Sequence, residues 1–412
     1  MGQTPSIVDR LSSWDLLAKI AVGFALITLG TKYYFMALPV FFDWAELRAS
    51  DFYVFWSAGQ IMRAHDAAAI FDLQIFNEQL KTQFDPTHKL GTDQEGFGLF
   101  WLYPPTMLPW VFPFGYMSAT AAIFLFTTFS LLVWYITIRN SFGRDTDASI
   151  LPVLFAPIVF VCLAFEQNGI LTACILIGFI YSVRNRRGPW MIALFACLML
   201  YKPTYGLLMP LVLIFERRWD AFLASGVLCT AYLGAVTAIW GLDYWHAFAQ
   251  QQSEFMVLIK QGLYAQFAVT TMSFFLQLGS DFNVAIVAHI VGVILQLGCF
   301  VIIWRKGNWD LRIAAFLILT PLLYYYGNIY DFVGSALAIG LLYPYFKAFK
   351  YGTIFLTAYW LIPIAFRTSI EAWGLLELPL LNPIVMGMMV YIAIKGIKPV
   401  PGVYHASSSA SQ

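Results

Sequence analysis

The recurrence of apolar runs separated by short polar turns constrains the fold of this chain more than any other feature. Hydrophobic residues make up 60% of the 412 residues and charged residues only 11%. A bilayer core accommodates about 20 apolar residues per helix, and several runs approach that length without the alternation typical of membrane strands. In lipid, each helix satisfies its own backbone polar groups. The sequence therefore predicts an all-α polytopic membrane protein.

Basic residues set the predicted orientation, because short loops rich in Lys and Arg stay in the cytoplasm. These loops contain Arg139, Arg144, Arg184, Arg186, Arg187, Arg217, Arg218, Arg305, Lys306, Lys347, Lys350, Lys395 and Lys398. About twelve spans then have both chain ends inside. They are predicted at residues 20–42, 106–138, 150–165, 170–183, 190–201, 205–216, 219–240, 283–304, 311–326, 332–347, 351–366 and 384–397. The apolar segment 266–279 does not fit this count, and we expect it to be re-entrant or to lie on the outer interface.

This arrangement predicts one transmembrane domain over residues 1–397, followed by a disordered cytoplasmic tail at 398–412. Two outer loops, 43–105 and 241–282, are long. The first has helical periodicity, which predicts two amphipathic helices lying flat on the interface. Their apolar faces are formed by Phe52, Phe55, Trp56, Gly59 and Met62 in one and by Leu73, Phe76, Leu80 and Phe84 in the other. An aromatic cover of this kind suits a lipid-linked substrate.

Charge and cysteine usage exclude several classes of partner. The net charge is +1, and no basic stripe with interleaved aromatic residues suggests nucleic acid. The five cysteines lie singly in apolar runs, which favours packing over disulfides or metal ligation. The histidines share no ligand spacing, and Asp145-Thr146-Asp147 is interpreted as a solvated cytoplasmic loop. The sequence predicts neither a cofactor nor a bound metal.

Polar side chains gather at the predicted outer ends of the spans. They are Asp51, Glu166, Gln167, Asn168, Lys202, Tyr330, Asp331 and Arg367. Two polar breaks, at Lys202-Pro203 and at residues 166–169, interrupt runs too short to span a bilayer alone. Such breaks persist at membrane depth only where they are buried in protein or line a wet cavity. These residues are therefore candidates for a functional site.

Structural roles would explain the same residues. Asp51 precedes an apolar-periodic helix and would serve as its N-cap, and Asp331 would cap a helix from residue 332. Gln167 and Asn168 would cap the turn before Gly169. Lys202 would extend to the interface or pair with Glu166.

Five motifs resemble glycosyltransferase family 87, whose members are multi-spanning GT-C type enzymes similar to phosphatidylinositol-mannoside mannosyltransferases. The motifs are DFYVFWSAGQIM from residue 51, FWLYPPTMLPWVFPFGYMS from 100, EQNGILTACIL from 166, LMLYKPTYGLLMPLVLIFERRW from 198 and NIYDFVGSALAI from 328. The third is similar to the family's Gly-Gln-x-Asn turn, with Glu166 in place of the usual glycine. The resemblance covers residues 50–220 well and the rest loosely.

The resemblance implies an inverting transfer of a sugar from a polyprenyl-phosphate donor to a hydroxyl of a lipid or glycan acceptor. The sugar would be mannose or another hexose, and Asp51 would be the general base. Lys202 is the first candidate to bind the donor phosphate, with Arg367 and Arg48 as alternatives. Candidates for sugar or acceptor binding are Glu166, Gln167, Asn168, Tyr330, Asp331, Tyr103 and Glu95. The site would face the periplasm or exterior of a bacterial inner membrane.

Two other classes of function compete with this prediction. A secondary transporter or flippase for a lipid-linked or small polar solute would place its polar residues near the bilayer midplane, between internal repeats. A membrane scaffold would need neither the Lys-Pro break nor the Glu-Gln-Asn turn. The concentration of polar residues at the outer rim favours the enzyme.

Overall fold

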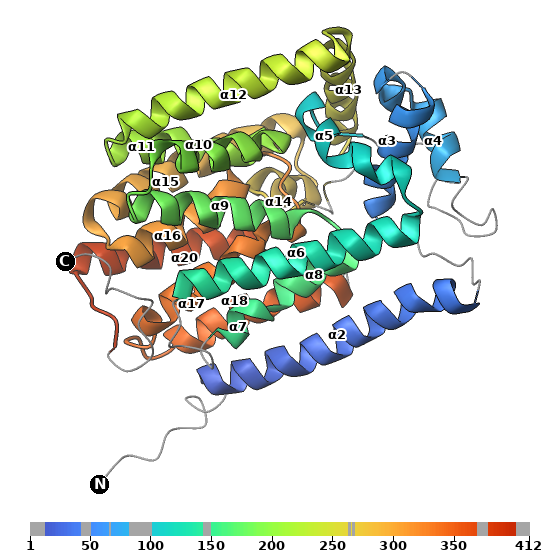
Figure 1. Ribbon diagram of the computed structural model, residues 1–412. Helices are drawn as coiled ribbons and strands as arrows, with labels where there is room; N and C mark the ends of the chain where they lie inside the picture. The colour runs from blue at the N-terminus through green and yellow to red at the C-terminus, as the bar shows by residue number, and fades with distance from the viewer. Residues whose placement is uncertain are drawn as a thin grey trace.

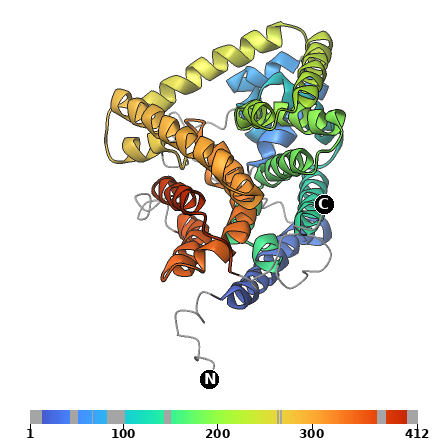
Figure 2. The ribbon, with the colours of Figure 1, turned by 90° about the vertical axis from the view of Figure 1, so that its left-hand side faces the viewer.

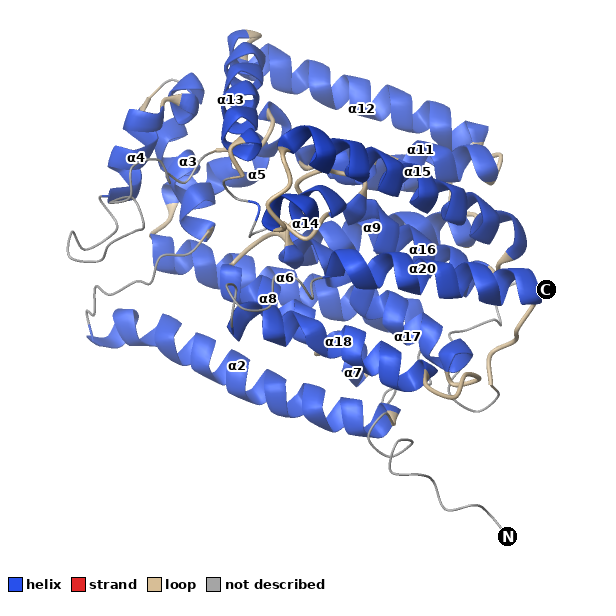
Figure 3. Cartoon of the chain, turned by 180° about the vertical axis from the view of Figure 1, so that it is seen from behind, coloured by secondary structure: helices blue, strands red, loops and turns tan. Residues whose placement is uncertain are grey.

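The computed structural model describes residues 13–42, 51–65, 67–81, 101–142, 150–262, 265, 268–368 and 378–400. These parts of the chain form a bundle of helices and loops (Figures 1 and 3). The α-helices are α2 (Trp14–Phe42), α3 (Phe52–Ala64), α4 (Leu73–Lys81), α5 (Leu108–Val111), α6 (Ala119–Phe142), α7 (Leu151–Leu154), α8 (Pro157–Phe165), α9 (Gly169–Arg184), α10 (Pro189–Leu198), α11 (Leu208–Phe215), α12 (Trp219–Trp240), α13 (Asp243–Lys260), α14 (Thr271–Gln277), α15 (Phe282–Lys306), α16 (Trp309–Leu319), α17 (Gly334–Phe346), α18 (Gly352–Thr368) and α20 (Leu378–Lys395). Short 3-10 helices lie at η1 (Ala67–Phe71), η3 (Pro105–Met107), η4 (Phe112–Tyr116), η6 (Met199–Tyr201), η7 (Pro203–Gly206), η9 (Thr320–Leu322) and η10 (Ile329–Val333).

Basic residues gather at one end of the bundle, although α3 and α13 at the other end also carry one each in the last turn, Arg63 and Lys260. Helices α6, α9, α15 and α20 carry basic residues in their last turns. These turns lie together at the left of Figure 1, and we call this side the basic end. Helices α3, α4, α5 and α13 gather at the opposite end (Figure 1). Figure 2, viewed from the basic end, shows α13 crossing the far side of the bundle from α12 towards α15.

Four described helical segments are long and apolar enough to cross a membrane, namely Ala119–Phe142, Trp219–Trp240, Phe282–Lys306 and Ile329–Phe346. Six shorter apolar segments accompany them, among them Gly169–Arg184 and Pro203–Phe215. Three of the long segments are largely exposed on the outside of the bundle and the fourth, Ile329–Phe346, is buried within it, and together they confirm the predicted all-α polytopic membrane protein. The count of twelve spans stays a prediction.

The helix boundaries correct one predicted span and add detail to the second outer loop. Residues 106–138 are not one helix, because Pro105, Pro109 and Pro113 start the separate short helices η3, α5 and η4 before α6. The predicted outer loop 241–282 contains the 18-residue helix α13. The same loop contains α14, which has seven residues and spans about 10 Å, too short to cross a bilayer.

Helix α17 forms the centre of the bundle. Every residue from Gly334 to Phe346 is buried, and α16 packs along it with a run of buried residues from Ile313 to Leu319. Helices α8, α10 and α11 are only 9, 10 and 8 residues long. At 1.5 Å per residue each covers about half of a 30 Å hydrocarbon core. The end of α8, the end of α10 and the start of α11 therefore lie inside the bundle, whereas the turn before α10 and Arg217 after α11 are exposed.

Helix α3 is held by close contact with η4. A Cβ on Gly59 would lie 2.6 Å from the carbonyl oxygen of Val111, and one on Gly115 would lie 2.2 Å from that of Gly59, so neither position tolerates a side chain. Trp56 Nε1 donates a hydrogen bond to the Met117 carbonyl at 2.9 Å. Ten of the thirteen residues of α3 are buried. The sequence predicted one apolar face for α3, but protein covers the helix on nearly all sides.

Other expectations for the outer loop and the tail lie outside the described residues. On α4, Phe76 is fully buried, as its apolar face predicts. The side chains of Leu73 and Leu80, residue Phe84 and the tail from residue 401 are not among the described parts of the chain.

Candidate active site

A cavity of about 390 Å³ lies where the short helices end, near α3 and α13. Its wall is mostly aromatic and aliphatic, with a few polar groups pointing inward. The lining residues are Asp51, Val54, Phe55, Leu102, Tyr103, Pro104, Phe165, Gln167, Tyr201, Lys202, Pro203, Thr204, Tyr205, Phe248, Gln252, Phe255, Tyr324, Tyr326, Asn328, Ile329, Tyr330 and Asp331. We call it the chamber. It unites segments from the first to the last third of the chain.

Asp51 directs its carboxylate into the chamber and does not cap its helix. It stands at the N-cap position of α3, but its backbone is right-handed helical and its side chain makes no capping hydrogen bond. Instead, Asp51 Oδ2 accepts a hydrogen bond from Gln167 Nε2 at 2.9 Å. The capping interpretation is wrong because the carboxylate forms its hydrogen bond with a partner that lies 116 residues away along the chain.

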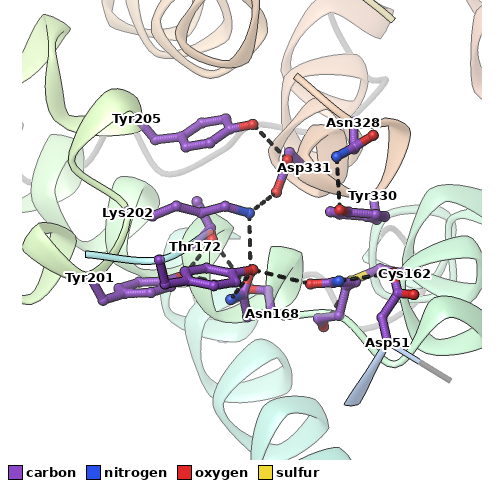
Figure 4. Close-up of polar contacts among 12 residues, drawn as sticks. Asp51, Cys162, Asn168, Thr172, Tyr201, Lys202, Tyr205, Asn328, Tyr330 and Asp331 are labelled. Carbon is purple, nitrogen blue, oxygen red and sulfur yellow. Dashed lines mark hydrogen bonds and ion pairs between the residues drawn. The ribbon is translucent and has the colours of Figure 1, made fainter. Parts of the chain in front are cut away.

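Gln167 and Asn168 form the next links of the network, which Figure 4 shows in close-up. The Tyr103 hydroxyl donates to Gln167 Oε1 at 3.3 Å and accepts from Asn168 Nδ2 at 3.0 Å. Asn168 precedes α9, yet its side chain makes no capping hydrogen bond. Both amides therefore serve the chamber, and neither caps the turn.

Lys202 lies at a break between η6 and η7, where Pro203 prevents the helix from continuing. Its ammonium donates to Asn168 Oδ1 at 3.1 Å and to Asp331 Oδ1. The rings of Tyr205, Tyr330 and Tyr103 surround it, with centroids 5.0, 5.6 and 5.9 Å from Nζ. The side chain is 14% exposed. Lys202 thus pairs with an acid inside the protein and does not extend to the interface.

Asp331 accepts a second hydrogen bond, from the Tyr205 hydroxyl to Oδ2 at 2.6 Å. It lies within η10, while α17 begins at Gly334 without a side-chain cap, so the capping interpretation of Asp331 is also wrong. The close approach of α9 positions η10, because a Cβ on Gly169 would lie 1.9 Å from the Tyr330 carbonyl oxygen. Gly169 therefore sets the distance between the amide turn and the Lys202–Asp331 pair.

Six of the residues singled out in the sequence line the chamber: Asp51, Tyr103, Gln167, Lys202, Tyr330 and Asp331. Asn168 is buried behind the wall, where it bonds to Tyr103 and Lys202. Glu166 is half-buried beside them but is not part of the lining. Arg48 and Glu95 lie outside the described residues, and only the backbone of Arg367 is described, in α18.

Sequence reasoning missed several residues of the chamber. Tyr205 is the most important, because its hydroxyl fixes Asp331. It lies three residues after Lys202, in the motif already singled out. Phe248, Gln252 and Phe255 share one face of α13, where a spacing of three to four residues could have marked them.

The electrostatics of the chamber favour a reactive carboxyl at Asp51. Burial raises the pKa of Asp51 from its ordinary value of 3.8 to about 6, the hydrogen bond from Gln167 opposes the rise, and the charge of Glu166 adds to it. A raised pKa of this size is common among catalytic bases. Among the described residues, no group of three or more His, Cys, Asp or Glu side chains is placed to hold a metal ion.

Comparison with known proteins assigns the family. Residues 101–324 match the sequence model of glycosyltransferase family 87, which covers more than half of the chain. The chain belongs to glycosyltransferase family 87. It is therefore a glycosyltransferase, and its apolar helices make it a multi-pass membrane protein. No similar curated protein and no similar solved structure was found.

The family match includes some of the site residues and excludes others. It includes Tyr103, Gln167, Asn168 and Lys202, and it extends beyond residue 220, where the good resemblance of the sequence motifs ended. It begins after Asp51 and ends before Asp331. The geometry of the chamber, through the Gln167 and Lys202 hydrogen bonds, connects these two carboxylates to the matched region.

Proposed function

We propose that this glycosyltransferase transfers a hexose, mannose or a related sugar, from a polyprenyl-phosphate donor to a hydroxyl of a lipid or glycan acceptor. Asp51 acts as the general base of an inverting displacement. The reaction takes place in the chamber, on the side of the membrane away from the basic end, which the positive-inside rule assigns to the exterior or periplasm. Neither a cofactor nor a nucleic-acid partner is part of the proposal.

One observation carries this proposal: Asp51, whose carboxylate accepts a hydrogen bond from Gln167, lines the same cavity as Lys202. An inverting transfer needs a base for the attacking hydroxyl and a positive group for the leaving phosphate. The Gln167–Tyr103–Asn168 chain connects the two groups and fixes their relative positions.

Each of these residues has its own role in the proposed reaction. Asp51, with its pKa near 6, is mostly ionised at neutral pH and accepts the proton of the acceptor hydroxyl as the glycosidic bond forms. The lipid phosphate leaves with the electron pair of the broken bond and needs no general acid. Lys202 stabilises the charge that develops on that phosphate. Gln167 and the phenol of Tyr330 line the chamber, which suits hydrogen bonding to the hydroxyls of the sugar, while Asn168 holds Tyr103 and Lys202 from behind.

Asp331 limits the charge that Lys202 offers to a donor phosphate. The pair is nearly neutral, and one ammonium N–H remains after the bonds to Asn168 and Asp331. Donor binding therefore draws on that third N–H or on a partial release of Asp331. Arg367 and Arg48 remain the further candidates for the donor phosphate. The apolar wall of the chamber, including Phe165 and Phe255, suits a prenyl chain more than a water-soluble nucleotide sugar.

The decisive experiment incubates purified protein with a panel of polyprenyl-phosphate sugars and a membrane lipid extract. We expect transfer by the wild type and its loss in Asp51→Asn, with Asp243→Asn on the exposed face of α13 as the matched control. Transfer that persists in Asp51→Asn would remove Asp51 as the base. Absence of transfer with every donor, together with solute counterflow in vesicles, would instead favour a transporter or flippase.

A further inference from the structure

The Lys-Pro break places two hydrogen-bond donors on one side of a short turn. The Tyr205 amide bonds to the Lys202 carbonyl at 3.0 Å across η7, and side chains three residues apart in a 3-10 turn lie one above the other. Both donors reach the same carboxylate, since Lys202 Nζ bonds to Asp331 Oδ1 and the Tyr205 hydroxyl bonds to Oδ2 at 2.6 Å (Figure 4). The turn therefore forms a site for an anion, with one donor for each of two oxygens.

Asp331 is not the only group that holds the ammonium in place. Lys202 also donates to Asn168 Oδ1 at 3.1 Å, and Asn168 is held in turn by its bond to the Tyr103 hydroxyl. Three tyrosine rings lie with centroids 5.0 to 5.9 Å from the ammonium nitrogen. Because Asn168 and these rings occupy the other directions around the ammonium, a phosphate meets both donors at the place where the Asp331 carboxylate lies.

The charge of the two phosphates in the proposed reaction makes a competing anion useful. A phosphate ester accepts hydrogen bonds on its free oxygens as a carboxylate does. The donor is a phosphodiester with a single negative charge, whereas the polyprenyl phosphate that leaves is a monoester with a charge of about −1.5 to −2 at pH 7. A lysine and a phenol alone would therefore hold the product more tightly than the donor. The buried Asp331 carboxylate opposes this, because leaving it without its donors is costly.

We propose that Tyr205 binds the donor phosphate together with Lys202, and that Asp331 occupies this anion site between turnovers. The donor displaces the carboxylate from its two donors, and the return of Asp331 promotes release of the product. The main chain of η10 stays in place, because Gly169 packs against the Tyr330 carbonyl. This inference rests on the proposed function, which places the donor phosphate at Lys202. It gives Asp331 a role in phosphate exchange in place of the sugar or acceptor contact expected from the sequence.

A purely structural ion pair would explain the same contacts, but the two roles predict opposite effects on phosphate binding. If Asp331 only orients Lys202, removing its charge should leave phosphate binding unchanged or make it weaker. If Asp331 competes with phosphate, Asp331→Asn should make binding tighter. We expect a gain of about tenfold, because the phosphate then displaces a neutral amide and no longer a charged acceptor from the two donors.

The test measures the Kd of a polyprenyl phosphate without sugar for purified protein in lipid nanodiscs, so it does not require sugar transfer. The polyprenol of the same chain length reports binding of the chain alone. Asp331→Asn should lower the Kd of the phosphate and leave that of the polyprenol in place. Asp331→Ser, a smaller neutral residue, should give the same gain and serves if Asp331→Asn does not fold.

Tyr205→Phe tests the second donor. By itself it should change the Kd of the phosphate little, because its hydroxyl only exchanges one anion for another. Combined with Asp331→Asn it should cancel most of the gain, since the hydroxyl then exchanges a neutral amide for a charged phosphate. Tyr324→Phe provides the matched control: Tyr324 lines the same chamber, but its hydroxyl bonds to Tyr325 at 3.3 Å, so its loss should leave the gain intact.

Phosphate binding that is unchanged or weaker in Asp331→Asn would overturn the proposal. An equal gain in Asp51→Asn, which removes the other carboxylate lining the chamber, would assign the effect to net charge and also overturn it. A double variant that keeps the whole gain would remove Tyr205 as a phosphate ligand. If the Kd values change as expected but no donor supports transfer, the anion site stands and the proposed function fails. Transfer by the wild type without these changes in Kd would have the reverse meaning.

Discussion

Replacing Asp51 with Asn should abolish transfer and, at neutral pH, make the protein more stable. Folding moves the pKa of Asp51 from 3.8 to about 6, so the folded protein binds this proton more tightly than the unfolded chain does. The charged form is therefore a cost to folding above that range. At about 1.4 kcal/mol for each tenfold change in proton affinity, the cost at pH 7 is about 3 kcal/mol. Asn removes the charge and still accepts the hydrogen bond from Gln167.

The sign of the pH dependence distinguishes this effect from ordinary repacking. As the pH falls through 6 towards 4, wild-type Asp51 takes up its proton, and its destabilising charge disappears. The advantage of Asp51→Asn should therefore fall to about half at pH 5 and to about 0.5 kcal/mol at pH 4. Only the difference between variant and wild type is compared, so other titrating groups cancel.

Thermal unfolding in detergent, followed by tryptophan fluorescence from pH 4 to pH 8, measures this difference. Asp243→Asn, at an exposed position, controls for the general effect of removing a carboxylate. A variant of Asp51 that is less stable than wild type at pH 7, or whose advantage does not change with pH, would refute the buried, destabilising charge on which the proposed base depends.

Three further variants test the rest of the network. Lys202→Met should abolish transfer and lower the stability by about 3 kcal/mol, because it leaves Asp331 buried without its counterion. Adding Asp331→Asn to this variant should restore stability but not transfer. Unfolding and activity assays of both variants would show this. Tyr103→Phe removes the hydroxyl between the two amides and should lower kcat/KM about tenfold, with a stability change of about 1 kcal/mol. Gly169→Ala should separate α9 from η10 and lower both activity and melting temperature, whereas Gly234→Ala, with open space around it, should change neither transfer nor fold.

The sequence predicted which residues meet but not how each one is held. Apolar run lengths and the Lys-Pro break are local properties, and they identified the helices around the chamber and the polar turns within it. Capping preferences are local too, and at Asp51, Asn168 and Asp331 they favoured the wrong interpretation. In each case the polar group bonds to a side chain that is distant in the sequence, and local propensity carries no information about such partners.

Other misses have equally local causes. Helix α13 contains the run QQQSE, whose polarity hides a helix that packs on protein along one face. The segment 105–118 is as apolar as a spanning helix, so composition alone does not show that its prolines divide it. Tyr205 was overlooked because a tyrosine in an apolar run gives no sign that its hydroxyl is bonded to a buried acid.

The ion pair between Lys202 and Asp331 has a consequence for how the protein is made. The two residues are 129 positions apart in the chain. At about 5–20 residues per second, a ribosome needs roughly 6–26 s to reach Asp331 after it has added Lys202. During that interval, the insertion machinery has to accommodate an unneutralised ammonium among apolar helices. A nascent chain truncated before Asp331 should consequently be a substrate for membrane quality-control proteases.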